Sequence, residues 1–336
     1  MKTFNKKNSD KQTANTNTPE TSVPKRKKSN TLLIIGVVLL LAAIIFTLYA
    51  YNTSYQESRE IGDTLSAVKA ELTAVKEGTA QGDPEALAAQ VDTLSQDKLA
   101  KERPYSYGLT ALFFSILLIL KGVFNSLIGV SVAQTTKTNI NRLAQAGLLA
   151  ALCYIGFAFF KIDIPVGPEK TAFHFGNVFC VLAALLLGGY WGGLAGAIGM
   201  TIGDLTTSYV TSAPKTFLLK LCIGLIVGFV AHSIFKLSKS HSPKYTTGVT
   251  ILACSCGMIF NIVADPLVGY FYKMYLLGIP QDIATVLAKW SAVTTSVNAV
   301  VAVIAASIFY LALRTPLMKA GLFVQLHREE SKEENA

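Results

Sequence analysis

Charged side chains are scarce in this sequence. Only 15% of its 336 residues are Asp, Glu, Lys or Arg, whereas 51% are hydrophobic. A soluble protein carries roughly 25% charged residues, so a soluble globular domain is excluded. Apolar runs of about 18 residues or more recur, and each is long enough to cross a hydrocarbon core about 30 Å thick. These runs do not alternate with a period of two, which excludes a membrane β-barrel. We therefore predict an all-α, multi-pass protein embedded in the lipid bilayer of the cell membrane.

Cysteine is also scarce, and the five cysteines all lie inside apolar runs. They are Cys153, Cys180, Cys222, Cys254 and Cys256. Zinc favours clustered ligands that polar neighbours orient by hydrogen bonds, and these positions offer neither. We therefore predict no metal site and no disulfide.

Sequence signatures of common enzymes are missing. The chain contains no G-x-x-x-x-G-K-[ST], no H-E-x-x-H and no G-x-S-x-G. The first absence excludes nucleotide hydrolysis by a P-loop in this chain, and the other two exclude the corresponding metalloprotease and serine hydrolase sites. We predict that the protein is not an enzyme and needs no cofactor.

The net charge of +9 does not indicate nucleic-acid binding. Eight lysines and arginines lie in the first 28 residues, and most of the others flank apolar runs. Positive charge next to membrane spans marks their cytosolic ends. Residues 1–30 have almost no apolar content and are predicted to be a disordered, basic cytosolic tail.

A transmembrane hairpin is predicted over residues 31–134. The apolar run at 31–51 is about 20 residues long and follows a long tail, which favours a retained anchor over a cleaved signal peptide. Residues 52–104 are polar and acidic on balance, and apolar residues spaced by four and three predict two short amphipathic helices outside the membrane. They form either a helical hairpin or a coiled coil between protomers. The run at 109–132 returns to the cytosol.

Six further spans are predicted in a main domain at 140–315, followed by a cytosolic tail at 316–336. The predicted spans are residues 143–160, 174–187, 193–209, 216–235, 247–275 and 283–313. Outer loops are expected at 161–168, 211–214 and 276–282. Lysines and arginines gather in the predicted inner loops, so both termini are placed in the cytosol and the total is eight spans.

Polar side chains converge on the outer half of this domain. Residues 172–216 read as two helices that reverse at the glycine turn 188–193, so His174 and Asn177, which open the first helix, lie level with Asp204. Asp204 is eleven residues from Gly193, or about 16 Å above the inner face. Buried polar groups of this kind mark sites or pathways in membranes. The candidate substrate-binding residues are Asn177, Asp204, Tyr209, Lys220, Asn261, Asp265, Lys289 and Trp290. The alternative is that Asp204, Asp265, Lys220 and Lys289 form structural salt bridges.

Small residues crowd the cytosolic half of the first span of the main domain. Ala146 and Ala150, and likewise Gly147 and Ala151, are spaced by four residues. Small residues at this spacing allow another helix to approach closely. This face is predicted to dock a partner protein.

Several of these segments resemble one known family. They are Ile164-Pro165-Val-Gly, His174-Phe-Gly-Asn177, LLLGGYWGGLAGAIGMTIGDL ending after Asp204, Tyr209, and APKTFLLK ending at Lys220. Over about residues 143–315 the chain is similar to the substrate-binding S component of an energy-coupling factor (ECF) vitamin transporter, of the riboflavin type. The alanine face resembles that family's A-x-x-x-A signature.

The resemblance implies a six-helix protein that captures a vitamin or vitamin precursor under its outer loops. The ligand would be riboflavin-like or of the pyrimidine or pyridine type. The alanine motif would dock a transmembrane coupling protein driven by two ATPase subunits on other chains. Residues 1–142 have no counterpart in the usual form. A membrane sensor or scaffold that uses residues 52–104 to bind a partner, or a stand-alone secondary transporter, are the alternatives.

Overall fold

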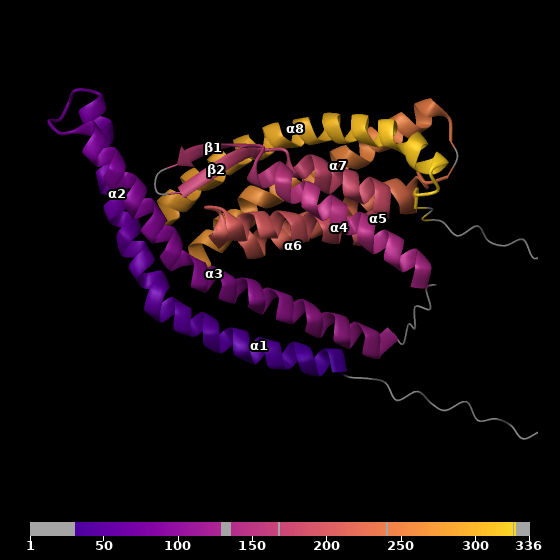
Figure 1. Ribbon diagram of the computed structural model, residues 1–336, viewed down its shortest axis with the longest axis horizontal. Helices are drawn as coiled ribbons and strands as arrows, with labels where there is room; N and C mark the ends of the chain where they lie inside the picture. Colours follow the sequence, from indigo (N-terminus) through magenta and orange to yellow (C-terminus); the bar gives the residue numbers. More distant parts are fainter. Residues whose placement is uncertain (1–30, 129–135, 167–168, 240, 325, 327–336) are drawn as a thin grey trace, which may run out of the picture.

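A helical bundle forms the larger part of the protein. The computed structural model describes residues 31–128, 136–166, 169–239, 241–324 and 326, so the predicted tail at 1–30 lies outside the described residues. Five long helices make up the bundle: α4 (Thr136–Ala158), α5 (Gly176–Thr206), α6 (Ala213–Gly228), α7 (Pro243–Tyr275) and α8 (Gln281–Lys319). They lie side by side with their long axes roughly aligned (Figure 1).

The described residues include seven helices that are long and apolar enough to cross a membrane. This confirms the all-α membrane class. The prediction of eight spans counts the two halves of α5 separately. Gly188 inside α5 has φ 81° and ψ 172°, a conformation that side chains on an L-residue rarely allow.

The chain reverses at Gly188. A Cβ on Gly192 would overlap the backbone of Ala183, and one on Gly196 would overlap Cys180. Residues on the two sides of Gly188 are therefore in antiparallel contact. The reversal returns Asp204 to the end of the bundle where Asn177 lies.

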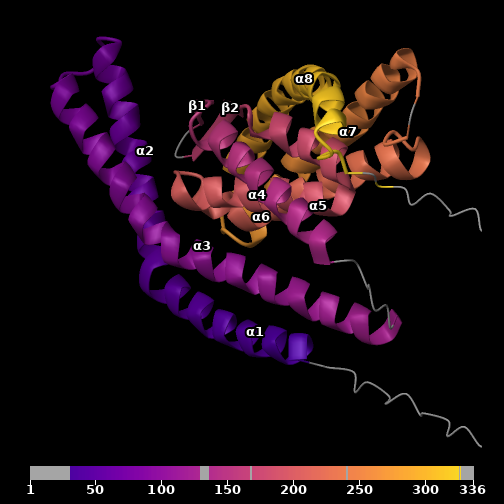
Figure 2. The same ribbon diagram turned by 45° about the vertical axis from the view of Figure 1, so that its right-hand side comes forward.

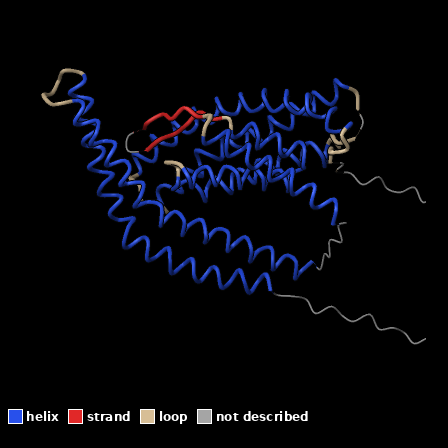
Figure 3. Tube along the Cα trace, viewed as in Figure 1, coloured by secondary structure: helices blue, strands red, loops and turns tan. Residues whose placement is uncertain are grey.

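A short β-hairpin replaces the predicted outer loop at 161–168. Strand β1 (Lys161–Val166) pairs with β2 (Glu169–His174) in antiparallel register, with Lys161 opposite His174 and Val166 opposite Glu169. Each strand of this two-stranded sheet is an edge strand. Pro165, which has no backbone N–H to donate, is therefore tolerated in β1. The prediction of a loop was wrong, and so was the start of the next helix at His174, which ends β2. Figure 3 shows the strands at one end of the bundle.

The N-terminal segment forms a long helical hairpin. It consists of α1 (Thr31–Ala50), the π-helical turn η1 (Tyr51–Tyr55), α2 (Gln56–Lys76) and α3 (Pro84–Ile128). The predicted amphipathic helices exist, but they continue directly from the spans, and α3 runs through Pro104 without a break. The Asp83 carboxylate accepts a hydrogen bond of 2.9 Å from the Glu85 amide, which caps the start of α3.

This hairpin contacts the bundle at its β-hairpin end. The Tyr55 and Tyr105 hydroxyls donate hydrogen bonds of 2.8 Å and 2.9 Å to the carbonyls of Leu277 and Leu276 in the α7–α8 connection. Lys98 on α3 pairs with Glu169 on β2 at 3.0 Å. Figure 2 shows α1 and α3 running along one side of the bundle.

The opposite end is closed by Arg314. Its guanidinium donates hydrogen bonds to Thr246 Oγ1 at 2.8 Å and to the carbonyl oxygens of Leu237 and Lys239 at 3.2 Å and 2.7 Å. The tail predicted from residue 316 begins later in the structure, because α8 continues to Lys319. Part of that predicted tail, 327–336 and residue 325, lies outside the described residues.

Close packing of α5 against α6 gives a first prediction. A Cβ on Gly224 would overlap the backbone of Gly193, and backbone atoms cannot move aside as a side chain can. Gly224→Ala should therefore destabilise the protein by about 1–3 kcal/mol, seen as a lower midpoint of thermal unfolding in detergent. Gly248→Ala is the matched control, because no atom lies within 4 Å of the added methyl group. Equal midpoints for the two variants would contradict this packing.

Candidate functional site

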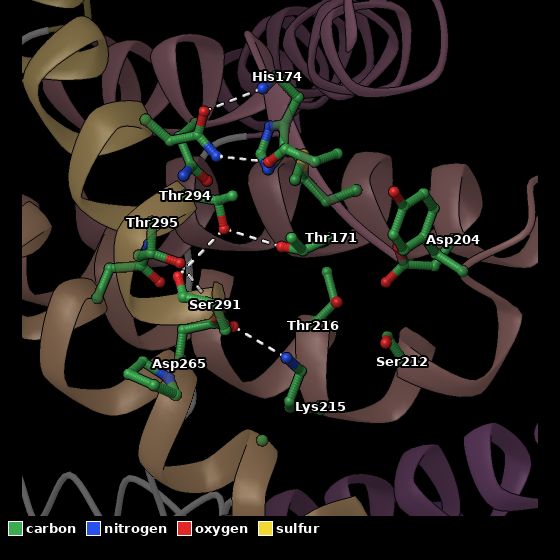
Figure 4. A pocket seen from close by; sticks show the side chains of 18 of the residues that line it. Thr171, His174, Asp204, Ser212, Lys215, Thr216, Asp265, Ser291, Thr294 and Thr295 are labelled. Atoms are coloured by element: carbon green, nitrogen blue, oxygen red, sulfur yellow. Dashed lines mark hydrogen bonds and ion pairs between the residues drawn. The ribbon is translucent and has the colours of Figure 1, made fainter. Parts of the chain in front are cut away.

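A polar pocket lies at the β-hairpin end of the bundle. Its cavity volume is about 100 Å³. Its walls come from β2, the two halves of α5, and α6, α7 and α8, so elements far apart in sequence meet there. Figure 4 shows side chains from these elements pointing toward one another.

Six of the eight predicted substrate-binding residues line this pocket: Asn177, Asp204, Tyr209, Lys220, Asn261 and Asp265. Lys289 and Trp290 do not. Both are exposed on α8, where 44% of the Trp290 surface is accessible. The structure therefore does not bring those two residues to the site.

The Asp265 carboxylate joins three helices. Its Oδ1 pairs with Lys215 Nζ from α6 at 3.0 Å. Its Oδ2 accepts hydrogen bonds from the hydroxyls of Ser291 and Thr295 on α8, at 2.5 Å and 3.2 Å (Figure 4). The predicted alternative of salt bridges thus holds for Asp265, but its partner is Lys215 and not Lys220 or Lys289.

Other polar atoms in the pocket have no hydrogen-bond partner among the described residues. They include Asn177 Oδ1, Asp204 Oδ2 and Asn261 Oδ1. These three residues are only 1%, 2% and 1% exposed. An unpaired buried polar group costs about 1–3 kcal/mol, so this end of the pocket is prepared to bind a polar molecule.

Lys220 is buried in the same region, with 6% of its surface exposed. Among the described residues, no carboxylate lies within 4 Å of its Nζ. A buried lysine without an ion pair is costly in a membrane protein. It can donate up to three hydrogen bonds to a ligand.

Strand β2 covers the pocket and is held by α8. Asn298 accepts a hydrogen bond from the His174 amide and donates one to the Ala172 carbonyl, each 3.0 Å long. The hydroxyls of Thr171 and Thr294 lie 2.8 Å apart. The β-hairpin is therefore fixed over the site by side chains one helical turn apart on α8.

His174 is neutral in this setting. Burial, together with the nearby positive charges of Lys220 and Lys161, lowers the pKa of its imidazole to about 3, against the opposing effect of Asp265. Its ring packs edge-on against Phe157, with centroids 5.0 Å apart. His174 therefore brings no positive charge to the pocket at neutral pH.

Tyr209 closes one side of the pocket. Its hydroxyl donates a hydrogen bond of 2.9 Å to Asp163 on β1, and Lys161 Nζ lies 4.6 Å from the ring centroid. Burial, and then the Asp163 charge, raise the pKa of Tyr209 above its ordinary value. The phenol stays protonated and acts as a donor that ties the α5–α6 connection to the β-hairpin.

A comparison with family models identifies the family of this chain. Residues 137–315 match the model of the ECF-type riboflavin transporter S component. The chain belongs to this family. It is thus a membrane subunit that binds a vitamin for an ECF transporter, a role distinct from that of an enzyme. Comparison with curated proteins and with solved structures gives no match. The matched residues include the whole pocket, and the helical hairpin α1–α3 precedes them.

The predicted docking residues of this S component divide between two faces of α4. Ala146 is buried in the core, and a Cβ on Gly199 of α5 would overlap the Ala150 carbonyl. Gly147 and Ala151 are exposed, and no atom lies within 4 Å of a Cβ placed on Gly147. Of these two predicted pairs, Gly147 and Ala151 are the pair left open to another helix by the residues that the structure describes.

Sequence reasoning missed several pocket residues of the S component, among them Lys215, Lys273, Ser291 and Thr295. Lys273 follows Asp265 by two helical turns, so it lies on the same face of α7. On α8 the exposed residues form a regular stripe with Trp290. This stripe is Val286, Val293, Val297, Val300 and Ile304. Its spacing was the available signal that Trp290 faces outward and Ser291 inward.

Breaking the Asp265–Lys215 pair tests the structural part of the site. Asp265→Asn keeps the shape but leaves the Lys215 ammonium, whose side chain is 11% exposed, without its counter-charge. Loss of one partner of a buried pair costs about 3–5 kcal/mol, so the unfolding midpoint in detergent should fall. Adding Lys215→Met to Asp265→Asn should restore part of the loss. Additive effects of the two changes would contradict an interaction between them.

The neutral His174 predicts an acid sensitivity. Its pKa is 6.5 when free and about 3 in the fold, so between these values the unfolded chain binds the extra proton. Stability should therefore fall as the pH drops below about 6.5. His174→Gln should flatten this dependence in unfolding midpoints measured from pH 7.5 to 5. His241→Gln, outside the pocket, should keep the slope of the unmodified protein; a similar slope in both variants would refute the assignment.

Proposed function

We propose that this S component captures a vitamin at the outer side of the membrane and passes it to a transmembrane coupling protein driven by two ATPase subunits. One observation carries the proposal. Asn177, Asp204 and Asn261 direct unpartnered buried oxygen atoms to a single pocket in the part of the chain that matches the family. A ligand with matching donors would satisfy them.

The vitamin in the family's name fits this chemistry. The ring system of riboflavin carries an imide, with one N–H donor between two carbonyl acceptors. The side-chain oxygens of Asn177, Asp204 and Asn261 are acceptors for such a donor, and Lys220 is a donor for the carbonyls. Pyrimidine and pyridine-type vitamins share part of this pattern and remain the other ligand classes.

The orientation follows from the distribution of charge. Five positively charged residues lie toward the end of the bundle opposite the β-hairpin: Arg142, Lys236, Lys239, Arg314 and Lys319. By the positive-inside rule that end faces the cytosol. The pocket then opens outward, α1 begins and α8 ends on the cytosolic side, and both termini are cytosolic.

The coupling protein would dock on the open face of α4. Gly147 and Ala151 expose backbone at the spacing that lets two helices approach closely. Ala146 and Ala150, which pack inside the bundle, would support this face by holding α4 in place. In this assignment residues 140–315 are the binding domain and residues 31–134 are a separate membrane hairpin.

The alternatives make different predictions. A sensor or scaffold would depend on residues 52–104 and tolerate changes in the pocket. A stand-alone secondary transporter would move substrate without an ATPase. Uptake of labelled riboflavin is measured in cells with and without the coupling module. Uptake that requires the module indicates transport by an ECF complex and distinguishes it from both alternatives.

Binding of riboflavin is the direct test. Titration of the purified full chain with riboflavin, followed by quenching of flavin fluorescence, should show saturable binding. Lys220→Gln should weaken it about tenfold or more, because a hydrogen bond from a charged donor contributes about 1.5–3 kcal/mol. Lys289→Gln is the matched control and should bind as the unmodified protein does, since Lys289 lies outside the pocket. No binding of riboflavin would overturn the flavin assignment, and equal loss of binding in both variants would overturn the assignment of this pocket as the binding site.

A further inference from the structure

Positive side chains outnumber negative ones around the pocket. Lys170, Lys215, Lys220 and Lys273 line it, as do Asp204 and Asp265. With His174 neutral, the lysines exceed the aspartates by two. Riboflavin has no charge, so an uncharged ligand would leave this excess uncompensated.

Two of these lysines face the same stretch of α7. Asp265, Gly269 and Lys273 are spaced by four residues and all line the pocket. Lys215 reaches this face from α6: its Nζ would lie 3.4 Å from a Cβ on Gly269. Lys215, Gly269 and Lys273 all line the pocket, so the cavity adjoins both lysines beside Gly269.

The nearby carboxylates of the described residues pair with lysines other than Lys273. Glu169 pairs with Lys98 at 3.0 Å, and Lys98 also binds Glu102 at 2.7 Å. Asp265 pairs with Lys215. Among the described residues, no carboxylate lies within 4 Å of Lys273 Nζ. Glu169 gives Lys273 its largest favourable charge interaction, and Glu169 already pairs with Lys98.

Lys273 also lies at the outer end of the pocket. It follows Asn261 by twelve residues on α7, which is about 18 Å along the helix axis. The unpartnered acceptor of Asn261 is therefore deeper in the pocket than the positive charge of Lys273. A ligand matched to both would be uncharged at one end and anionic at the other.

We propose that the ligand carries an anionic group, a phosphate or a carboxylate, that binds between Lys273 and Lys215 beside Gly269. Its ring occupies the deeper end near Asn177, Asp204 and Asn261. This inference rests on the proposed vitamin-binding function but not on the vitamin being a flavin. It names a charged form of the vitamin as the preferred ligand.

Paired ligands that differ only in charge test the inference. The full-length chain in lipid nanodiscs is titrated calorimetrically with riboflavin and riboflavin 5′-phosphate, pyridoxine and pyridoxine 5′-phosphate, and nicotinamide and nicotinate. In whichever pair binds, the anionic member should bind about tenfold or more tightly, the effect of one charged hydrogen bond. Lys273→Gln should abolish this preference by weakening the anionic member more than the neutral one.

Three further variants sharpen the result. Lys289→Gln makes the same chemical change on the exposed face of α8 and should keep the preference. Lys273→Arg keeps the charge and should also keep it. If Lys273→Gln fails to fold, Gly269→Leu fills the space between the lysines without changing any charge, and it should selectively weaken the anionic member.

The outcomes separate this inference from the proposed function. Equal or tighter binding of the neutral member, or equal weakening of both members by Lys273→Gln, overturns the anionic site while vitamin binding stands. Binding of a pyridine pair but not the flavin pair overturns the flavin assignment, and the anion preference within that pair still decides the site. If no pair binds, both fail.

Discussion

A buried carboxylate must find its partners within the protein when lipid surrounds the fold, and Asp265 shows what this requires. Its two oxygens receive Lys215 from α6 and two hydroxyls from α8. Each partner removed would leave a group whose burial is costly in a membrane. The positions of α6, α7 and α8 around the pocket are therefore coupled through one side chain. The neighbouring Asn261, one turn away on α7, takes no part in this pairing.

Backbone geometry supplies the other half of the pocket. Gly188 turns α5 back on itself, and glycines beside the turn allow its two halves and α6 to approach at backbone distance. Asn177 and Asp204 are 27 positions apart in the sequence, yet they reach the same pocket because of this reversal. Glycine acts here through close packing of the hairpin, and the polar ends at its open side provide the chemistry.

The sequence was sufficient for the helices, the reversal and six pocket residues, because apolar length, glycine spacing and depth along a helix are one-dimensional properties. It was insufficient where the place of a residue depends on rotation about a helix axis or on pairing between distant segments. Trp290 was assigned to the site by depth alone, and the lipid-facing stripe of α8 turns it outward. The β-hairpin escaped prediction because Pro165, Gly167 and Pro168 are residue types typical of a loop. Lys215 was overlooked because its partner, Asp265, lies 50 positions away.

The N-terminal hairpin is attached to two segments at the pocket end of the bundle. Lys98 holds Glu169 on β2, while Tyr55 and Tyr105 hold the α7–α8 connection. The β-hairpin and the α7–α8 connection both lie at the end of the bundle that holds the pocket. Moving the β-hairpin away would separate a largely buried ion pair, at a cost of about 3–5 kcal/mol if one partner is left alone. Less is lost if α3 moves together with the β-hairpin. The strand that lines the pocket is therefore held by a segment that precedes the family match.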